Sequence, residues 1–287
     1  GTLNDDGDGM TASNLVVNAS GTTQFNGAVG NDQPIDSLTT DAAGTTSLNG
    51  SITVAGDVTL NDAVTLISDS TITATNVTFG STLDDDGMAG TGSNFVVNAS
   101  GVTRFLDEIG GNNALESIAT DAPGTTELSS VVNVTTGTIT FNDAVLLTES
   151  VTVNAGAGGA VSFNSTIDSE TGENNSVLIS GGAISFDGDI GAGTNGDQTI
   201  GSLTVTTATS VLFGTADAGE ITNVLTDGPI NLGSLSPITQ NITFDNDGLS
   251  IVTTGDDVRL NGPIVLADTN TSISTGSTSI GDIVFTN

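Results

Sequence analysis

The chain has 287 residues and a formal net charge of −32, and it contains no Cys, His, Trp or Tyr. Its two basic residues are Arg104 and Arg259, so many of the side chains that build catalytic sites are missing. A charge of this sign repels phosphates and anionic headgroups, which argues against direct binding of nucleic acid or of an acidic membrane surface. No apolar run reaches the roughly 18 residues that cross a bilayer, so we expect no membrane insertion.

The rest of the composition points to an all-β chain. Gly accounts for 38 residues and Pro for 5, and charged residues make up 13% of the chain, against about a quarter in typical globular domains. β-Branched residues are abundant, whereas the helix formers Glu, Gln, Lys, Arg and Met are scarce. With 36% hydrophobic residues, a chain of this length can bury a sizeable core.

Two nested repeats run along the chain. The first segments to return are SNLVVNASGTTQF at 13–25, repeated as SNFVVNASGVTRF at 93–105, and TDAAGTTSL at 40–48, repeated as TDAPGTTEL at 120–128. Two later segments return with larger offsets: VTLNDAV at 58–64 as ITFNDAV at 139–145, and VTFGSTLD at 77–84 as VSFNSTID at 161–168. Similarity at a nearly fixed period is typical of repeat architectures. It predicts long repeats near 3–82, 83–166 and 167–250, with a partial repeat at 251–287.

A shorter motif inside each long repeat places Phe or Leu in a recurring slot. These apolar anchors are Phe25, Leu48, Leu60, Phe79, Phe105, Leu128, Phe141, Phe163, Phe186, Phe213, Phe244, Leu260 and Phe285. A slot that recurs about every 20 residues is typical of coils that stack each anchor on the one before, in a single internal column. The sequence therefore predicts one continuous, single-stranded parallel β-helix, or β-solenoid, over 1–287, with roughly 12 to 14 coils that each rise about 4.8 Å.

A string of sandwich domains of about 80 residues each is the competing all-β interpretation. A sandwich gives no reason for the Phe slot to recur at shorter spacing, and its strands are usually longer than the bursts of three to five residues seen here. Clusters such as VGNDQP at 29–34 and GAGTNGDQ at 191–198 supply the turns that a solenoid needs. The chain opens at Gly1 inside this pattern, so we expect a processed product or part of a longer protein.

Four segments in a shared order carry a resemblance to known proteins: TQFNGAVG at 23–30, IDSL at 35–38, GTTSLNG at 44–50 and TFNDAV at 140–145. Together they resemble the β-strand repeats of very large bacterial surface proteins, which are similar to filamentous-haemagglutinin-type adhesins. The likeness covers most of the chain and is clearest before residue 215, whereas 215–250 departs from the pattern. The resemblance implies an extracellular, right-handed parallel β-helix that serves in adhesion or as a stalk.

Asn follows the apolar anchor at six places: Asn26, Asn49, Asn61, Asn142, Asn164 and Asn261. A corner that needs the left-handed backbone conformation would favour Asn, and stacked Asn side chains can also hydrogen-bond from coil to coil. We therefore expect these residues to be structural.

Acidic turns with the pattern Asp-x-Asp-Gly are the candidate metal sites. They supply Asp6 and Asp8, Asp84 and Asp86, and Asp245 and Asp247. Carboxylates spaced on a glycine turn are oxygen ligands of the kind that Ca²⁺ prefers. The first turn begins like an EF-hand loop, but Leu15 stands where that loop needs its Glu, so a complete EF-hand is not expected. The alternative is that these residues are solvated turns without a metal.

Catalysis finds little support in the sequence. Arg104 and Arg259 each precede an anchor, where strand alternation turns the side chain outward, and surface ion pairing is the expected role. Nothing singles out a carboxylate pair for glycoside hydrolysis, and without Trp or Tyr a sugar lacks its usual stacking platform. We expect no enzyme activity, and a polysaccharide-acting β-helix enzyme ranks third among the functions considered.

The first functional hypothesis is an extracellular structural or adhesive rod of a cell-surface adhesin or stalk. The second is a self-assembling filament, sheath or surface-layer protomer, because the open ends of a solenoid expose strand edges that tend to pair. The expected partners are divalent cations, a host or neighbouring cell surface, and further copies of the chain end to end.

Overall fold

The computed structural model describes residues 2–7, 13–88, 92–193, 198–214, 221–246, 248–267, 270–276 and 280–286. Over these residues the chain is all-β without a helix, and its parallel strands stack as a β-solenoid of about 11 turns, against the 12 to 14 coils expected. The chain divides into two compact units, Gly1–Thr135 and Thr136–Asn287. A single continuous solenoid over both units stays a prediction.

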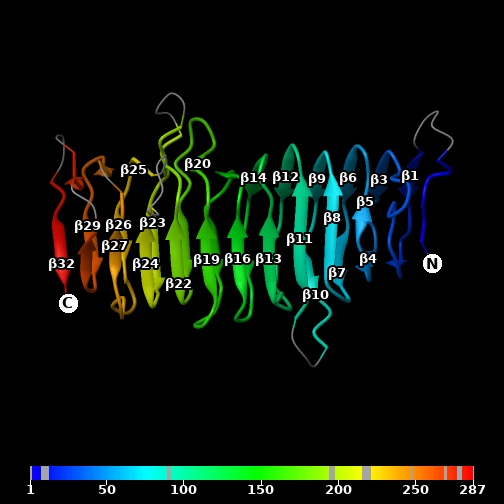
Figure 1. Ribbon diagram of the computed structural model, residues 1–287, viewed down its shortest axis with the longest axis horizontal. Helices are drawn as coiled ribbons and strands as arrows, with labels where there is room; N and C mark the ends of the chain where they lie inside the picture. Colours follow the sequence, from blue (N-terminus) through cyan, green and yellow to red (C-terminus); the bar gives the residue numbers. More distant parts are fainter. Residues whose placement is uncertain are drawn as a thin grey trace. The chain divides into compact units, whose positions relative to one another are not determined.

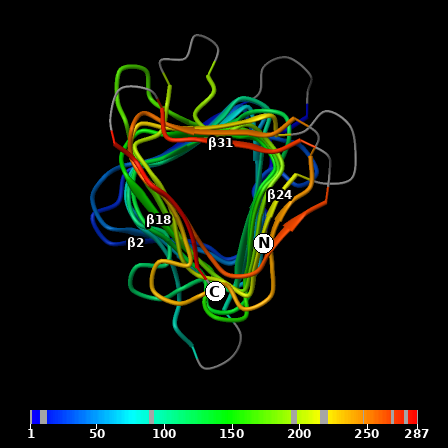
Figure 2. The ribbon, with the colours of Figure 1, turned by 90° about the vertical axis from the view of Figure 1, so that its left-hand side faces the viewer.

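Unit 1 is built of three parallel sheets, so that each turn of the chain has three sides (Figures 1 and 2). Sheet 1a contains β1 (Asn14–Val17), β3 (Ser37–Thr40), β6 (Asp57–Leu60), β9 (Asn76–Phe79), β12 (Val102–Phe105) and β14 (Thr125–Leu128). Sheet 1b contains β2 (Thr22–Phe25), β4 (Thr45–Leu48), β7 (Ala63–Leu66) and β10 (Leu83–Asp85). Sheet 1c contains β5 (Ile52–Thr53), β8 (Ser70–Ala74), β11 (Asn94–Ala99) and β13 (Ser117–Thr120). Isolated bridges at Ile109 connect β10 to β15 (Val132–Asn133).

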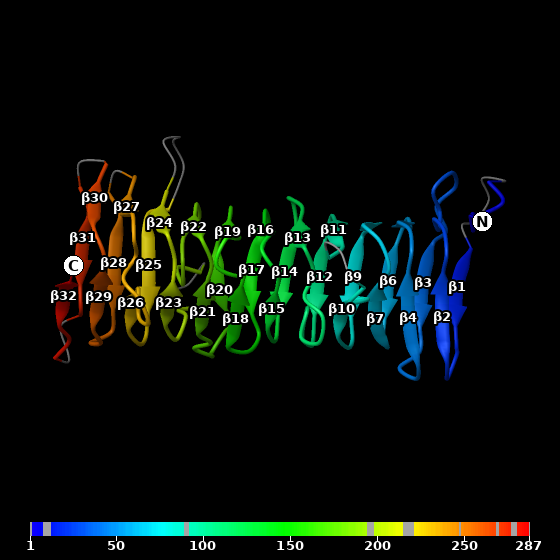
Figure 3. The same ribbon diagram turned by 90° about the horizontal axis from the view of Figure 1, so that it is seen from below.

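Unit 2 repeats this arrangement, again with three sides to a turn (Figure 3). Sheet 2a contains β17 (Ala144–Leu147), β20 (Ile167–Ser169), β25 (Asn223–Thr226), β28 (Ser250–Thr253) and β31 (Ser272–Ser274), with bridges at Ile190 joining β20 to β25. Sheet 2b contains β18 (Val151–Asn154), β21 (Val177–Ser180), β23 (Leu203–Thr207), β26 (Ile230–Leu232), β29 (Val258–Asn261) and β32 (Ile283–Thr286). Sheet 2c contains β16 (Thr138–Phe141), β19 (Ala160–Phe163), β22 (Ala183–Phe186), β24 (Ser210–Phe213), β27 (Ile242–Phe244) and β30 (Ile264–Leu266).

The core of each unit lies between its three sheets. Strand after strand alternates one buried and one more exposed residue, as β16 and β19 do, because successive side chains of a strand point to opposite faces. The inward positions carry Val, Ile, Leu and Phe, and most of them are almost completely buried. The outward positions are mainly Thr, Ser, Asn and Asp. Four-residue strands are sufficient here because consecutive turns within each unit pair with one another strand by strand.

The expectation of one internal Phe column is wrong. In unit 1, Phe25 and Leu48 lie in sheet 1b, whereas Phe79 and Phe105 stack in sheet 1a with ring centroids 5.1 Å apart. In unit 2, five stacked rings follow sheet 2c, with centroid distances of 5.3, 5.6, 5.0 and 5.4 Å: Phe141, Phe163, Phe186, Phe213 and Phe244. The anchors Leu260 and Phe285 pair with each other in sheet 2b instead. The anchors therefore occupy more than one side in each unit.

The length of the long repeat explains this distribution. Strands ten apart carry the same repeat position: β1 reads NLVV and β11 begins NFVV, and β2 ends in Phe25 as β12 ends in Phe105. One repeat consists of ten strands and one further side that is held by isolated bridges alone, at Val29, Ile109 or Ile190, which makes eleven sides. Because eleven is not a multiple of three, the next copy begins one side away. In unit 1, β1 lies in sheet 1a but β11 in 1c; in unit 2, β19 lies in 2c but β29 in 2b.

Three equivalent glycines form the corner after the isolated bridge. Gly30, Gly110 and Gly191 have φ angles of 70°, 67° and 64°, in the left-handed region that side chains disfavour. A Cβ on each would lie 1.9, 2.3 and 2.1 Å from a backbone carbonyl oxygen of the following turn. Only glycine lets the turns approach this closely.

The core makes a prediction about Phe163, which is buried between Phe141 and Phe186. We expect Phe163→Ala to lower the free energy of unfolding by about 3–5 kcal/mol, because the cavity breaks the stack of rings. The matched control is Phe163→Leu, which places in β19 the residue that Leu260 supplies in β29 and should cost less than the alanine variant, because it leaves a smaller cavity. Chemical denaturation measures both, and equal losses for the two variants would contradict the stacking account.

Candidate functional site

The acidic corners are the place where most candidate residues gather, and one corner recurs in all three long repeats. Its first position is Asn4, Asp84 or Asp168, which directly follows the residue that bridges to Val29, Ile109 or Ile190. In each case the side-chain Oδ1 accepts a hydrogen bond from a backbone N–H of the next turn: Asp32 at 3.3 Å, Asn112 at 2.9 Å and Gly193 at 3.1 Å. We name this position the corner cap. It ties two consecutive turns together.

The residue after each corner cap closes the loop that comes next. Asp5 Oδ1 accepts from Ser13 N at 3.0 Å, and Asp85 Oδ1 accepts from Ser93 N at 2.8 Å. In the third repeat the acceptor is a hydroxyl, since Ser169 Oγ takes the N–H of Asn175 at 2.9 Å. A carboxylate and a serine thus perform the same task. What the position requires is a short acceptor for one backbone donor, and not a charge.

Further carboxylates accept backbone donors between turns in the same way. Asp41 Oδ1 takes Ala19 N at 2.9 Å, and its repeat equivalent Asp121 takes Ala99 N at 2.7 Å. Asp189 Oδ1 accepts from Thr222 N at 2.6 Å and from Asn223 N at 2.9 Å. Much of the negative charge therefore caps backbone N–H groups that a parallel sheet leaves unpaired at its corners.

Among the residues predicted as calcium ligands, Asp84 and Asp86 accept backbone hydrogen bonds of this kind. Asp84 is buried and accepts from Asn112 N, Asn112 Nδ2 and Asn113 N, while Asp86 Oδ1 accepts from Met88 N at 2.9 Å. Asp6 is exposed and Asp245 half-buried, and Asp8 and Asp247 lie outside the described residues. Within the described part of the chain, no three acidic side chains gather as a group that could hold a metal ion. These hydrogen bonds favour the turn alternative, and calcium binding stays a prediction.

A second polar cluster lies inside unit 1, and the sequence patterns did not single it out. The Asp62 carboxylate is buried at the corner between β6 and β7, where it accepts hydrogen bonds from Thr40 Oγ1 at 2.7 Å and from Thr46 Oγ1 at 2.9 and 3.0 Å. The two threonines come from the preceding turn and are themselves buried. A charge removed from water is stable only when hydrogen bonds replace its hydration, and the threonine hydroxyls supply them.

The long repeats show that this cluster is one unit. The second repeat carries Thr120, Thr126 and Asp143 at the same positions, and all three are buried. In the third repeat the threonine positions become Val205 and Val211, both buried, and the carboxylate position becomes the exposed Ser234. The three residues therefore change together. The sequence could have predicted this cluster, because the paired Thr residues and the NDAV segment occur together in the first two long repeats.

One corner cap, Asp168, has a shifted pKa. Burial raises the pKa of Asp168 above its ordinary value of 3.8, and the nearby charge of Asp189 acts in the same direction, against the lowering effect of the Gly193 N–H. A carboxyl whose pKa is higher in the folded than in the unfolded chain stabilises the fold at pH values below its unfolded-state pKa, near 3.8. This contribution is lost as the pH rises through the folded-state pKa. At neutral pH the Asp168 charge therefore opposes folding.

Both arginines form surface ion pairs, as the sequence indicated. Arg104 Nε lies 2.7 Å from Glu127 Oε2, its direct neighbour across β12 and β14. Arg259 Nη2 lies 2.5 Å from Asp257 Oδ2. Four of the six asparagines that come after anchors make structural hydrogen bonds between turns: Asn164 Nδ2 donates to Asn142 Oδ1 at 2.7 Å, Asn61 Nδ2 to the Thr40 carbonyl at 2.7 Å and Asn261 Nδ2 to the Gly233 carbonyl at 2.9 Å. The expected left-handed backbone is wrong: among the described residues, only glycines have positive φ.

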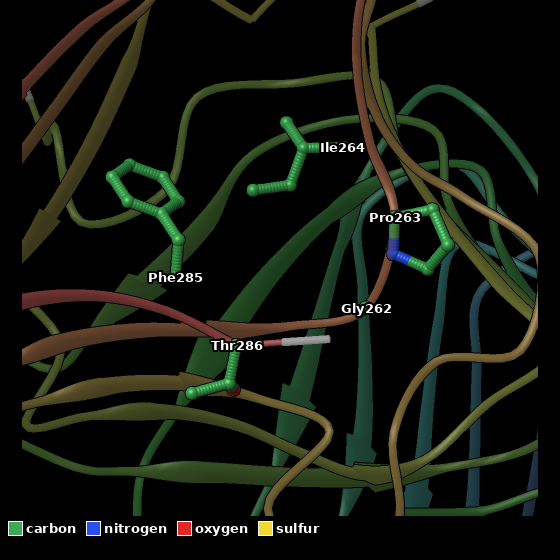
Figure 4. A pocket seen from close by; sticks show the side chains of 5 residues that line it. All are labelled: Gly262, Pro263, Ile264, Phe285 and Thr286. Carbon is green, nitrogen blue, oxygen red and sulfur yellow. The ribbon is translucent and has the colours of Figure 1, made fainter.

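Four hollows on the described surface do not resemble catalytic clefts. One lies on the outer face of sheet 2b and is lined by Ser, Thr, Val and Leu. Three others lie near the last turns of unit 2, where Arg259 is the single charged residue among their walls. Figure 4 shows one of these, with the Phe285 ring and the Ile264 side chain beside Pro263 and Thr286. No carboxylate lines any of the four.

Comparison with protein-family models, with curated proteins and with solved structures found no match. Within the described residues, no helix has the length and apolar character needed to cross a membrane.

The Thr40, Thr46 and Asp62 cluster predicts strongly coupled substitutions. Asp62→Ser leaves two buried threonine hydroxyls without their acceptor and should cost about 1–3 kcal/mol of unfolding free energy. Adding Thr40→Val and Thr46→Val, which reproduces the third repeat, should recover part of that loss. Thr45→Val, on the outward face of β4 next to Thr46, is the matched control and should have little effect. If the three changes are additive in denaturation experiments, the cluster is not a unit.

Asp168 predicts a pH-dependent gain in stability. Asp168→Asn keeps an acceptor for Gly193 N, as Asn4 does for Asp32 N, and removes a charge that is disfavoured at neutral pH. We expect a higher Tm than wild type at pH 7, and a difference that shrinks as the pH falls toward 3. Thermal melts across this pH range measure the effect. A lower Tm at pH 7 would show that the charge itself supports the corner.

Proposed function

We propose that the chain is an extracellular structural or adhesive element, a repeat region of a cell-surface adhesin or stalk. The observation that supports this most directly is the use of the polar side chains. The corner caps and the carboxylates at Asp41, Asp121 and Asp189 bind backbone donors of neighbouring turns, and the Asp62 cluster binds inside the wall. These polar side chains hold neighbouring turns together.

The charge of the chain fits the same function. With a net charge of −32, the outward face stays hydrated and repels other acidic macromolecules, while it attracts divalent cations as counter-ions. Calcium is one such cation. Contact with a host or neighbouring cell surface would then depend on screened or cation-bridged interactions and on the uncharged Thr, Ser and Asn of the outer faces.

A polysaccharide-acting enzyme is the weaker alternative. Two-carboxylate hydrolysis needs acidic residues roughly 5–9 Å apart on either side of a bound sugar. The four hollows described above contain none, and the chain has no Trp or Tyr on which a sugar could stack. The proposal therefore includes the absence of catalytic turnover.

Surface exposure is the property to test. Antibodies raised against the purified chain should label intact cells of the organism that makes it as strongly as permeabilised cells, because the epitopes face the medium. A parallel wash with excess chelator separates cation-bridged attachment from covalent or hydrophobic attachment. Labelling that appears only after permeabilisation would reject the extracellular location.

A further inference from the structure

Asparagine stands directly before glycine at four places in the chain: 26–27, 49–50, 195–196 and 261–262. Asparagine is chemically labile, and most so before glycine, because the next backbone nitrogen can attack the side-chain amide and no Cβ obstructs its approach. The pair at 195–196 lies outside the described residues, and β2, which precedes Asn26, has a described neighbour on one side only. The pairs that can be compared are therefore Asn49-Gly50 and Asn261-Gly262.

The first of these pairs leaves both of its reacting groups free. Asn49 and Gly50 form the corner between β4 and β5, and β4 pairs with β2 on one side and with β7 on the other. Asn49 is nevertheless exposed, and only its backbone N–H is held, by the Phe25 carbonyl at 2.9 Å. Within the described part of the chain, nothing forms a hydrogen bond with the Asn49 carboxamide or with the Gly50 N–H.

The second pair has the same two residues but is held at both groups. Asn261 Nδ2 donates to the Gly233 carbonyl at 2.9 Å, and Asn261 Oδ1 accepts from Thr286 Oγ1 at 3.0 Å. The Gly262 N–H donates to the Thr286 carbonyl at 2.9 Å. Asn261 is half-buried and Gly262 is buried. Attack within this pair would first have to break hydrogen bonds to both neighbouring turns.

We propose that Asn49 is a site of spontaneous deamidation and that the contacts of Asn261 protect it from the same reaction. The Gly50 backbone nitrogen attacks Asn49 Cγ and loses its proton, and the carboxamide nitrogen leaves as ammonia, so that a five-membered succinimide forms. Water then opens the ring at either carbonyl, which gives aspartate or isoaspartate at position 49. Water is the single co-reactant and ammonia the single by-product. This proposal is independent of the surface function.

The two products differ in their effect on the corner. Aspartate adds a negative charge, whereas isoaspartate also routes the backbone through the former side chain and inserts one more carbon atom between β4 and β5. The corner has little space for that change, because even a Cβ on Gly50 would lie 2.8 Å from the Gly27 carbonyl carbon of the preceding turn. Isoaspartate should therefore loosen the bonds that Val29 makes next to this corner, with Ser51 O at 3.0 Å and Thr53 N at 2.8 Å.

The test is peptide mapping by mass spectrometry of the folded 287-residue chain during storage in mildly alkaline buffer. Alkaline conditions accelerate the reaction, because the attacking nitrogen must lose its proton. We expect deamidation at Asn49 to be about tenfold faster than at Asn261 or more, since the hydrogen bonds of Asn261 and Gly262 must open first. Asn61, which precedes Asp62 and is hydrogen-bonded to Thr40 O, is an internal control that should stay intact.

The chain unfolded in guanidinium chloride is the reference, and storage continues until it is deamidated at both pairs. Without the fold, Asn49 and Asn261 should react at similar rates, so the difference between them belongs to the structure. Asn49→Gln keeps the carboxamide but needs a larger ring for the attack, and it should prevent modification at this corner. Circular dichroism verifies that this exposed substitution leaves the fold unchanged.

Two outcomes would overturn the proposal. One is an Asn49 that stays intact in the folded chain while the unfolded chain is deamidated, since the corner would then protect it. The other is deamidation of Asn49 and Asn261 at equal rates in the folded chain, since the hydrogen bonds would then make no difference. Chromatographic separation of the aspartate and isoaspartate peptides gives the proportion of chains whose corner is lengthened.

Discussion

The parallel pairing of each turn with the next is the interaction on which the structure depends. A strand of four residues cannot bury a core by itself, but pairing in register brings Val, Ile, Leu and Phe of successive turns into direct contact. Where pairing stops at a corner, a side chain accepts the unpaired backbone N–H, as Asp84 and Asp168 do. The abundance of Asp and Asn results from this need, since each of the three sides of a turn ends at a corner.

Much of the fold could be predicted from the sequence, because repetition is visible without any alignment. The strands fall on the segments that repeat, and the anchors are inward as the alternation requires. The error in the single Phe column could not be foreseen, since Phe25 and Phe105 occupy the same repeat position although one belongs to sheet 1b and the other to sheet 1a. Which sheet an anchor joins depends on the number of sides per repeat. That number includes short bridged segments such as Val29, which have no strand signature.

The acidic residues, too, could be predicted only in part from the sequence. Their position in turns was clear, and the spacing of Asp84 and Asp86 made metal binding a reasonable hypothesis. Their hydrogen-bond partners come from the following turn, as Asn112 does for Asp84, and sequence spacing within one turn carries no information about them. Comparing the long repeats reveals the role better than the motif does, because Asn4 and Ser169 perform the same tasks without a carboxylate.

The mismatch between eleven sides in a repeat and three in a turn has a consequence for how such chains can change in copy number. Duplicating or deleting one whole repeat keeps every inward residue inward, because all sides share the same alternation. It nevertheless moves every later outer face one side around the core. Only a block of three repeats restores the original orientation of those later faces. Genetic expansion of this chain can therefore conserve its interior while redistributing its surface in three directions.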